Sequence, residues 1–196
     1  MYLSNGLLSS FHHRRRTALF FSGSGSTVQA LIDQVETLNI VSAFSSKKSA
    51  VGLARAKRAG IAAHVCKFPD ESGHVLQLLN AAQINTIFLA GFMKILSADF
   101  INQFKAAGIG CRIFNIHPSI LPNYKGLAAT EAAFADQTLL GVTIHDVVAE
   151  VDSGKWFKRT PSLSETQTKK VELTEAALWQ RASEQNILKA WGSCHQ

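Results

Sequence analysis

Two side chains that can take part in chemistry, Asn115 and His117, stand in a stretch that also contains two prolines. The stretch follows the apolar run 111–114, which is typical of the end of a buried strand. Asn115 offers an amide donor and acceptor, and the imidazole of His117 changes charge near neutral pH. Pro118 and Pro122 restrict the backbone, so we expect a stiff loop after the strand. Open α/β sheets bind ligands at the carboxyl ends of their strands, which makes this stretch a candidate site.

A second set of polar side chains, His145 and Asp152, follows downstream. Taken singly, each residue has an ordinary structural explanation, because Asn often forms turns and a His beside a strand is often a satisfied structural group. Composition alone therefore favours a structural role for Asn115 and His117. The later His and Asp shift the balance, because an amide, an imidazole and a carboxylate together can stabilise an oxyanion and move protons.

Four segments, taken in order, resemble the motifs of the folate-dependent formyltransferases: Leu89–Leu96, Asn115–Pro122, Gly141–His145 and Asp152–Gly154. The pattern Asn-x-His-Pro-Ser-Ile-Leu-Pro with a downstream Asp is far more restrictive than a lone glycine motif. The resemblance is to the branch that formylates glycinamide ribonucleotide in de novo purine biosynthesis, and it is strong over residues 17–151 and weak after them. It implies a Rossmann-like α/β fold and 10-formyltetrahydrofolate as the co-substrate that supplies the formyl group.

The resemblance implies catalytic roles for three residues. Asn115 would donate a hydrogen bond to the oxyanion that forms when the amine attacks the formyl carbon, and protonated His117 would stabilise the same charge. Asp152 would raise the pKa of the imidazole and order a water molecule that carries protons. We expect His145 to support the Asp152 loop from within a strand, and Ser119 to bond loop backbone rather than act as a nucleophile.

Binding residues are also implied by the resemblance. A glycine-rich turn is expected to hold the ribonucleotide phosphate, because glycines allow close approach and a helix start favours anions; its residues are Gly23, Ser24, Gly25, Ser26 and Thr27. An apolar wall with accessible backbone is expected for the folate; its residues are Phe92, Met93, Lys94, Ile95, Leu96, Val148 and Asp152. Glu184 is the nearest candidate for a family Glu that contacts the substrate amine, a loose match, and no metal is implied.

The expected surroundings of the acceptor amine depart from the family pattern. Ala128 and Ala129 stand where histidines are usual, and Ser153–Trp156 replaces Gly-Gly-Pro and an apolar strand. Lys94 replaces an Arg, which keeps the charge but loses the bidentate geometry, and Thr27 replaces an Asn. Two alternatives therefore stay open. One is a formyltransferase that acts on another amine, such as an amino-sugar nucleotide; the other is a non-catalytic folate- or nucleotide-binding homologue.

The elements that must position these residues alternate between apolar strands and amphipathic helices, which predicts a doubly wound, mostly parallel α/β sheet. The expected strands are 17–21, 40–44, 61–66, 86–90, 111–114 and 141–148, with a further strand at 155–160. The expected helices are one that starts at Ser26 or Thr27, one that ends near residue 59, and those at 72–82, 98–105, 126–134 and 172–191. Ser97 and either Ser26 or Thr27 are the expected N-caps, and Arg55, Lys57 and Arg58 are interpreted as a solvated helix face.

Length and composition limit the architecture. The 196 residues suffice for one core, so we expect a single domain at 17–196 after a flexible N-terminal extension at 1–16. Three widely spaced cysteines exclude a disulfide framework, and the lack of Cys-x-x-Cys and His-Glu-x-x-His argues against zinc. The net charge of +6 suits an anionic ligand. We expect a cytoplasmic monomer or homodimer that binds two small-molecule substrates, the ribonucleotide and the folate, and binds neither nucleic acid nor a membrane.

Overall fold

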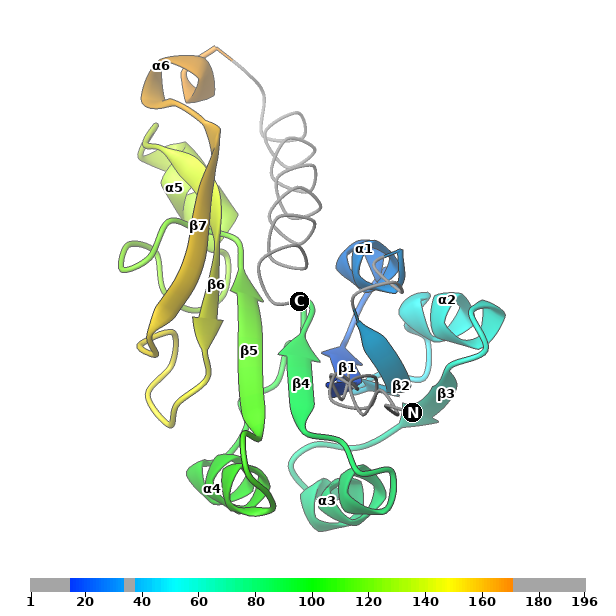
Figure 1. Ribbon diagram of the computed structural model, residues 1–196. Helices are drawn as coiled ribbons and strands as arrows, with labels where there is room; N and C mark the ends of the chain where they lie inside the picture. Colours follow the sequence, from blue (N-terminus) through cyan, green and yellow to red (C-terminus); the bar gives the residue numbers. More distant parts are fainter. Residues whose placement is uncertain (1–14, 34–37, 171–196) are drawn as a thin grey trace, which may run out of the picture.

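The computed structural model describes residues 15–33 and 38–170 and is built on a seven-stranded sheet, with the strand order β3-β2-β1-β4-β5-β6-β7 (Figure 1). The strands are β1 (Arg16–Phe21), β2 (Asn39–Ser45), β3 (Ala62–Val65), β4 (Thr86–Leu89), β5 (Arg112–His117), β6 (Leu140–Asp146) and β7 (Trp156–Leu163). The helices are α1 (Ser26–Ile32), α2 (Gly52–Arg58), α3 (Ser72–Ala81), α4 (Ala98–Ala106), α5 (Ala129–Ala135) and α6 (Glu165–Thr168).

The sheet is parallel from β3 to β5, and β6 and β7 return antiparallel. The predicted mostly parallel, doubly wound α/β sheet is therefore confirmed. The strand order changes direction between β1 and β4. Strands β2 and β3 lie on one side of β1, and strands β4 to β7 follow one another on its other side. In sheets of this kind the crevice outside the carboxyl ends of the strands, at the reversal, is the usual ligand site.

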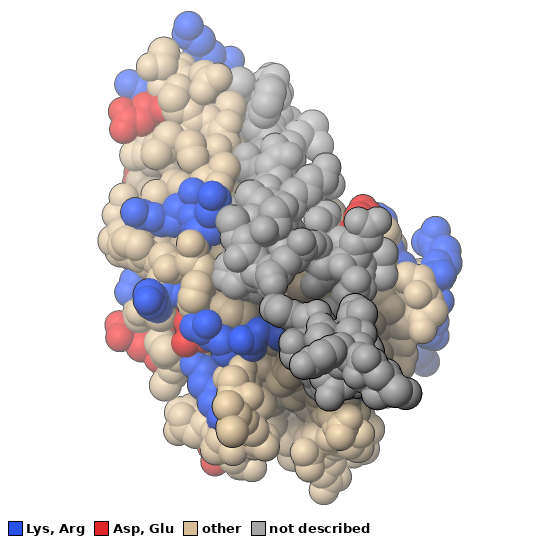
Figure 2. Space-filling model, in the orientation of Figure 1, with Lys and Arg blue, Asp and Glu red and all other residues tan. Residues whose placement is uncertain are grey.

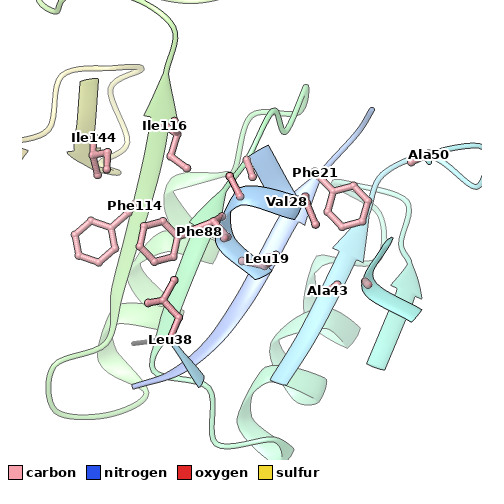
Figure 3. Packing of buried hydrophobic residues seen from close by; sticks show 14 of the residues in the cluster. Leu19, Phe21, Val28, Leu38, Ala43, Ala50, Phe88, Phe114, Ile116 and Ile144 are labelled. Carbon is pink, nitrogen blue, oxygen red and sulfur yellow. The ribbon is translucent and has the colours of Figure 1, made fainter. Parts of the chain in front are cut away.

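Alternation along the strands divides most of the described core into two large clusters, one on each face of the sheet. On β1, Leu19 and Phe21 belong to the cluster that packs with α1 and α2, while Phe20 belongs to the cluster that packs with α3 and α4. Figure 3 shows the first cluster, in which Phe88 and Phe114 from the neighbouring strands β4 and β5 stack with ring centroids 5.3 Å apart. Burial on both faces explains why the central strands are continuous apolar runs in the sequence.

The starts of α4 and α1 are set in different ways. Ser97 caps α4, and its side chain accepts a hydrogen bond from the N–H of Phe100 at 3.1 Å, as predicted. The predicted cap of α1 by Ser26 or Thr27 is wrong. Gly25 is the N-cap, with φ of 74° and no side-chain cap, because this glycine adopts a left-handed conformation that brings Ser26 directly into the first turn.

Strand β5 is longer than the apolar run that predicted it. It continues through Asn115 and ends at His117, so the prediction that both residues lie in a loop after the strand is wrong. The cause is pairing with β6, in which Asn115 lies opposite His145 and His117 lies opposite Thr143. Both candidate residues are thus held by the sheet itself.

The C-terminal part of the described chain holds further differences from the prediction. Strand β7 extends well beyond the predicted range 155–160, and α6 was not predicted, although Ser164 and Gln167 form a reciprocal capping box at its start. Helix α5 begins at Ala129 rather than near residue 126, because Ala128 before it adopts a left-handed conformation with φ of 57°.

Some predictions fall outside the described residues, namely the helix at 172–191 and most of the extension at 1–16. Strand β1 already begins at Arg16, the last residue of that predicted extension.

Within the described part of the chain, no helix has the length and apolar character needed to cross a membrane. On the face shown in Figure 2, Lys and Arg side chains form several separate groups, on the β6–β7 side and on the side of α1 and α2.

Candidate active site

Asn115 and His117 project from the carboxyl-terminal half of β5 toward the loop that joins β6 to β7. They are two residues apart in an extended strand, so their side chains share one face of the sheet. His117 is almost fully buried, and Asn115 is partly buried. The sheet therefore fixes the spacing between an amide and an imidazole before any loop contributes to the site.

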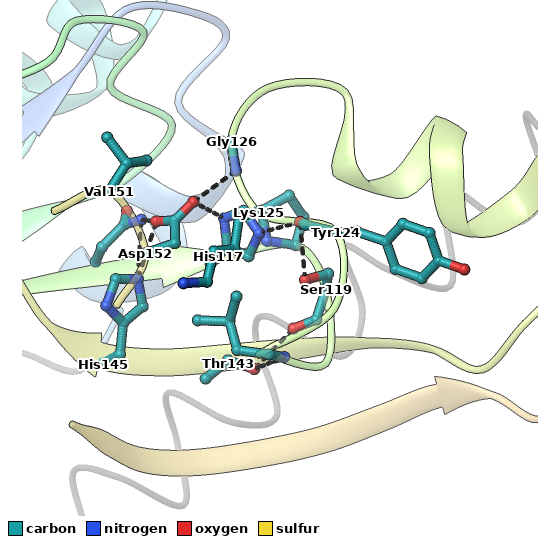
Figure 4. A network of polar contacts seen from close by, with 12 residues as sticks. His117, Ser119, Tyr124, Lys125, Gly126, Thr143, His145, Val151 and Asp152 are labelled. Carbon is teal, nitrogen blue, oxygen red and sulfur yellow. Dashed lines mark hydrogen bonds and ion pairs between the residues drawn. The ribbon is translucent and has the colours of Figure 1, made fainter. Parts of the chain in front are cut away.

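Asp152 is the residue on which these side chains converge, and Figure 4 shows it beside His117 and His145. Its Oδ1 accepts a hydrogen bond from Asn115 Nδ2 at 3.1 Å and lies 3.2 Å from His145 Nε2. Its Oδ2 accepts one from the backbone N–H of Gly126 at 2.8 Å and lies 3.3 Å from His117 Nδ1. The structure thus brings Asn115 and His117 to the carboxylate of Asp152, so that the three predicted catalytic residues lie together.

The Asp152 loop has a demanding backbone. Asp152 itself adopts a left-handed conformation with φ of 51°. Two residues later, Gly154 lies against β6 so closely that a Cβ atom at this position would collide with the carbonyl oxygen of Asp146. The N–H of Asp146 also donates to the carbonyl of Lys155 at 2.9 Å, which fastens the far side of the loop. Glycine at 154 is therefore required for Asp152 to reach the end of β5.

Burial and hydrogen bonding set the charges of the site. Burial raises the pKa of Asp152, but hydrogen bonds from His145 and from the Gly126 backbone, together with the charges of His117 and His145, bring that pKa down to about 2. The pKa of His117 is lowered from its ordinary value, because burial of the ring outweighs the Tyr124 carbonyl and the Asp152 carboxylate, which both raise it. Asp152 raises the pKa of His117, as expected from the sequence, but burial of the ring, which the sequence does not show, has the larger and opposite effect.

Two further predictions at this site are confirmed. His145, buried in β6, lies with Nε2 3.2 Å from Asp152 Oδ1 and donates from Nδ1 to the Asp146 carbonyl at 2.9 Å, so it supports the Asp152 loop. Ser119 donates its hydroxyl to the carbonyl of Asn123 at 2.7 Å and is buried among loop backbone. It is therefore held in the way expected of a structural serine.

The predicted phosphate turn, residues 23–27, lies at the carboxyl end of β1. A Cβ atom on Gly25 would come within 2.5 Å of the Cα of Gly52, the first residue of α2, so α1 and α2 start side by side. Arg55 of α2 reaches back and donates from Nε to the Ser24 carbonyl at 3.1 Å. Arg55, interpreted from the sequence as part of a solvated face, is thus the basic side chain that contacts this turn. No sequence signal distinguishes it from its neighbours, because only the packing of α2 on α1 brings it there.

The predicted folate segment, residues 92–96 after β4, divides into inward and outward side chains. Phe92 packs edge-on against Phe20 and Phe68, with ring centroids 5.4 and 5.2 Å away, and Leu96 is buried in the same cluster. The outward side chains include two large apolar ones, with Met93 58% and Ile95 74% exposed. Lys94 and Val148 are also exposed. An exposed apolar wall on a backbone anchored by buried rings is the arrangement expected for a flat ligand.

Ser22 joins the phosphate turn to the folate segment. Its hydroxyl accepts a hydrogen bond from the N–H of Met93 at 2.8 Å and shares another with the Ser46 hydroxyl at 2.6 Å. Its own N–H donates to the carbonyl of Gly91 at 3.0 Å. The two predicted binding segments, which are far apart in the sequence, therefore meet at the carboxyl ends of β1 and β4. Glu184, the predicted contact of the amine, lies outside the described residues.

Comparisons with known proteins give one consistent family. The chain matches the family described as formyl transferase over residues 15–186. It is 38% identical over 154 residues to the trifunctional purine biosynthetic protein adenosine-3 of Drosophila pseudoobscura pseudoobscura, an alignment that covers 72% of this chain and 11% of that much longer protein. It is 37% identical over 147 residues to the phosphoribosylglycinamide formyltransferase of Escherichia coli (strain K12), covering 69% of this chain and 67% of the relative.

The fold gives the same result. The crystal structure of phosphoribosylglycinamide formyltransferase from Anaplasma phagocytophilum superposes with a TM-score of 0.78 and 28% identity, covering 91% of this chain and 86% of that chain. The family match extends over nearly the whole sequence and includes each candidate site segment that the structure describes. The chain belongs to the formyl transferase family.

Proposed function

We propose that this protein transfers a formyl group from 10-formyltetrahydrofolate to the amine of glycinamide ribonucleotide in de novo purine biosynthesis. The observation that carries the proposal is the convergence of Asn115, His117 and His145 on the Asp152 carboxylate in a member of the formyl transferase family. The names of the E. coli relative and of the Anaplasma structure support glycinamide ribonucleotide as the acceptor. As such an enzyme it is expected in the cytoplasm, as a monomer or homodimer, with no role for a metal, a nucleic acid or a membrane.

The proposed reaction begins with attack of the amine nitrogen on the formyl carbon, which forms a C–N bond and places negative charge on the formyl oxygen. The amide N–H of Asn115 donates a hydrogen bond to this oxyanion, and the positive charge of protonated His117 stabilises it. When the intermediate collapses, the bond from the formyl carbon to the folate nitrogen breaks. The proton lost by the amine is the one gained by the folate nitrogen, so the net products are the formamide and tetrahydrofolate.

The lowered pKa of His117 supports an order for its two roles, first as a base and then as a positive charge. With a pKa below the ordinary value, the imidazole is neutral at neutral pH and is able to accept a proton as the amine attacks. The imidazolium that results lies beside the ionised Asp152, whose pKa of about 2 keeps it negative throughout. His117 is then charged when the oxyanion exists, and it returns the proton, directly or through a water held by Asp152, to the leaving nitrogen.

Substrate binding is assigned to two neighbouring segments. The turn at residues 23–27, with Arg55 against it, supplies backbone N–H groups and a positive charge for a phosphate. Met93 and Ile95, with the backbone around them, form the wall for the folate ring system. Because Ser22 joins these segments, the two substrates would bind next to each other.

One observation favours an amino-sugar nucleotide as a second candidate for the formyl acceptor. Ala128, which is exposed, and the exposed Lys155 stand in the part of the site that faces the acceptor in the family pattern, where histidines and a proline are usual. An amino-sugar nucleotide offers the same chemistry, an amine and a phosphate, with a bulkier sugar between them. The phosphate turn would serve either acceptor.

The deciding experiment is a spectrophotometric assay of formyl loss from 10-formyltetrahydrofolate, with glycinamide ribonucleotide, with an amino-sugar nucleotide, and without an acceptor. Loss that requires glycinamide ribonucleotide is the expected result. Loss that requires only the amino-sugar nucleotide would replace the acceptor while keeping the reaction. Loss without an acceptor would show a hydrolase, and tight folate binding without any loss would show a binding protein; either result would overturn the proposal.

A further inference from the structure

The backbone of Tyr124 contacts the side chain of His117, and the backbone of Gly126 contacts the side chain of Asp152. The carbonyl of Tyr124 accepts a hydrogen bond from His117 Nε2 at 2.8 Å, and the N–H of Gly126 donates to Asp152 Oδ2 at 2.8 Å. One short piece of main chain therefore supplies a hydrogen-bond partner to the imidazole and another to the carboxylate. Any shift of this segment moves both partners together.

The conformation of Tyr124 is one that a residue with a Cβ atom rarely adopts by itself. Its φ is 53°, in the left-handed region, where crowding between the Cβ atom and the backbone disfavours every residue except glycine. Local preference therefore opposes the position of the Tyr124 carbonyl, and contacts elsewhere must hold the residue there.

The side chain of Tyr124 provides those contacts on the side away from the site. Figure 4 shows its ring pointing away from His117 and Asp152. The ring packs against a small core cluster that contains Leu140, and the hydroxyl donates to Asp136 Oδ2 at 2.9 Å and accepts from Thr138 Oγ1 at 3.0 Å. Asp136 is the C-cap of α5, and Thr138 is fastened to α5 through its N–H. The phenol is thus tied to the end of a packed helix.

We propose that Tyr124 is a positioning residue for His117. The hydroxyl of Tyr124, held by Asp136 and Thr138, fixes the Tyr124 backbone carbonyl, which accepts the hydrogen bond from Nε2–H of the imidazole. Since Nε2–H donates to that carbonyl, the neutral ring leaves Nδ1 without a proton and directs it toward Asp152, 3.3 Å away. Nδ1 is then the atom that gains and loses the proton. The inference rests on the proposed role of His117 in formyl transfer, but the hydrogen-bond arrangement is measurable without any substrate.

The charged and titratable groups that face His117, among the described residues, come from two elements. Asp152 reaches it from the loop between β6 and β7, and the ring of His145 on β6 lies with its centroid 6.3 Å away. The Tyr124 carbonyl and Asp152 raise the pKa of His117, while burial, the largest effect, and His145 lower it. Loosening the Tyr124 carbonyl removes one of the two raising contributions, so the pKa of His117 is expected to fall.

The test compares Tyr124→Phe, which keeps the packed ring, with Asp136→Ala, which removes the partner of the hydroxyl and leaves the ring untouched. Asp136→Asn keeps an oxygen acceptor and is the conservative variant. Asp99→Ala is the matched control, since Asp99 is another exposed carboxylate that accepts a side-chain hydrogen bond, from Gln103 at 2.7 Å, on a different helix. Imidazole nitrogen NMR across a pH series reports the tautomer and the pKa of each histidine, and steady-state kinetics reports kcat and KM.

We expect Tyr124→Phe and Asp136→Ala each to lower the pKa of His117, to weaken its Nε2–H tautomer preference, and to lower kcat by about tenfold with little change in KM. The double variant should lose no more than either single one, while Asp136→Asn and Asp99→Ala should resemble the unsubstituted protein. An unchanged tautomer and titration of His117 in both Tyr124→Phe and Asp136→Ala would overturn the inference, even if activity fell. A shifted titration in a protein that transfers no formyl group would instead refute the proposed function and leave the positioning role intact.

Discussion

Asn115 Nδ2 donates a hydrogen bond to Asp152 Oδ1 at 3.1 Å across a separation of 37 residues in the sequence. Asn115 lies within a paired strand, whereas Asp152 lies in a loop with a left-handed backbone. One partner is therefore rigid by virtue of the sheet, and the other is brought to it by a turn that only certain residues permit. The same contact places the carboxylate 3.3 Å from His117 Nδ1, so a single loop conformation completes the site.

Replacing His117 by Ala should leave the fold intact and lower the rate of formyl transfer by at least about a hundredfold, because the group that stabilises the oxyanion is removed. The hydrogen bonds of β5 do not depend on this side chain. The measurement is kcat with saturating substrates, with circular dichroism to verify the fold. A well-folded variant with near-normal turnover would remove His117 from the catalytic set.

Replacing Asp152 by Asn should change how stability depends on pH. The pKa of Asp152 is lowered from 3.8 to about 2 in the folded protein, so its ionised form stabilises the fold at neutral pH and this contribution is lost as the pH falls from about 4 toward about 2. The shift corresponds to roughly 2 kcal/mol. Chemical denaturation of Asp152→Asn should therefore show a lower free energy of unfolding at neutral pH and a flatter acid limb.

The titration of His117 also lowers the free energy of unfolding at acid pH, but over a higher pH range than that of Asp152. Its folded pKa lies below 6.5, so the unfolded chain binds the proton more readily and stability falls as the pH drops below that value. The Asp152→Asn variant loses a neighbour that raises the pKa of His117, so its His117-dependent loss should not disappear. An acid limb of Asp152→Asn that matches the unsubstituted protein between about pH 4 and about pH 2 would contradict the assigned pKa of Asp152.

Replacing Gly25 by Ala should destabilise the protein and weaken binding of the phosphate-bearing acceptor. The left-handed φ of 74° alone costs at least about 1 kcal/mol with a Cβ atom present. The new atom would also lie 2.5 Å from the Cα of Gly52, which would push α1 and α2 apart. Gly23→Ala is the matched control for stability, because among the described residues nothing beyond its chain neighbours lies within 4 Å of its added Cβ. Thermal unfolding of both variants, with KM for the acceptor, decides the prediction.

Replacing Arg55 by Met should raise KM for the acceptor while KM for the folate stays unchanged. Met keeps most of the aliphatic stem but removes the charge that lies against the Ser24 carbonyl. A lost charge-assisted contact to a phosphate corresponds to about a tenfold weaker affinity. Arg58→Met is the control, since Arg58 lies on the same helix and, within the described part of the chain, donates to the Ala54 carbonyl of its own helix. Equal effects of the two substitutions would assign Arg55 to the general field of α2 and not to the turn.

Much of the fold follows from local sequence patterns. The strands β1 and β4 consist mainly of continuous apolar runs because both faces of a parallel sheet are covered, and such runs are visible without a structure. The start of α4 after Ser97 was also predictable, because a serine side chain caps the helix that directly follows it. These features depend on residues that are neighbours in the chain.

Features that depend on distant partners were missed. The extension of β5 through His117 needs β6 as a partner, and polar residues inside a strand do not resemble the end of an apolar run. The close approach of Gly52 to the cap of α1 at Gly25 comes from the packing of α2 on α1, and the role of Arg55 needs the same packing. In each case the deciding contact joins segments that the sequence separates.

The sequence by itself determined which groups are available for chemistry: an amide, an imidazole and a carboxylate in the order and spacing of a formyl transferase, with a glycine-rich turn and an apolar segment for the substrates. Only the tertiary structure decided how these groups act on one another. Burial at the carboxyl end of β5 lowers the pKa of His117 against the pull of Asp152, because removing the ring from water disfavours its charged form more than one carboxylate and one carbonyl favour it. Residue types are a property of the chain, whereas solvation is a property of the fold.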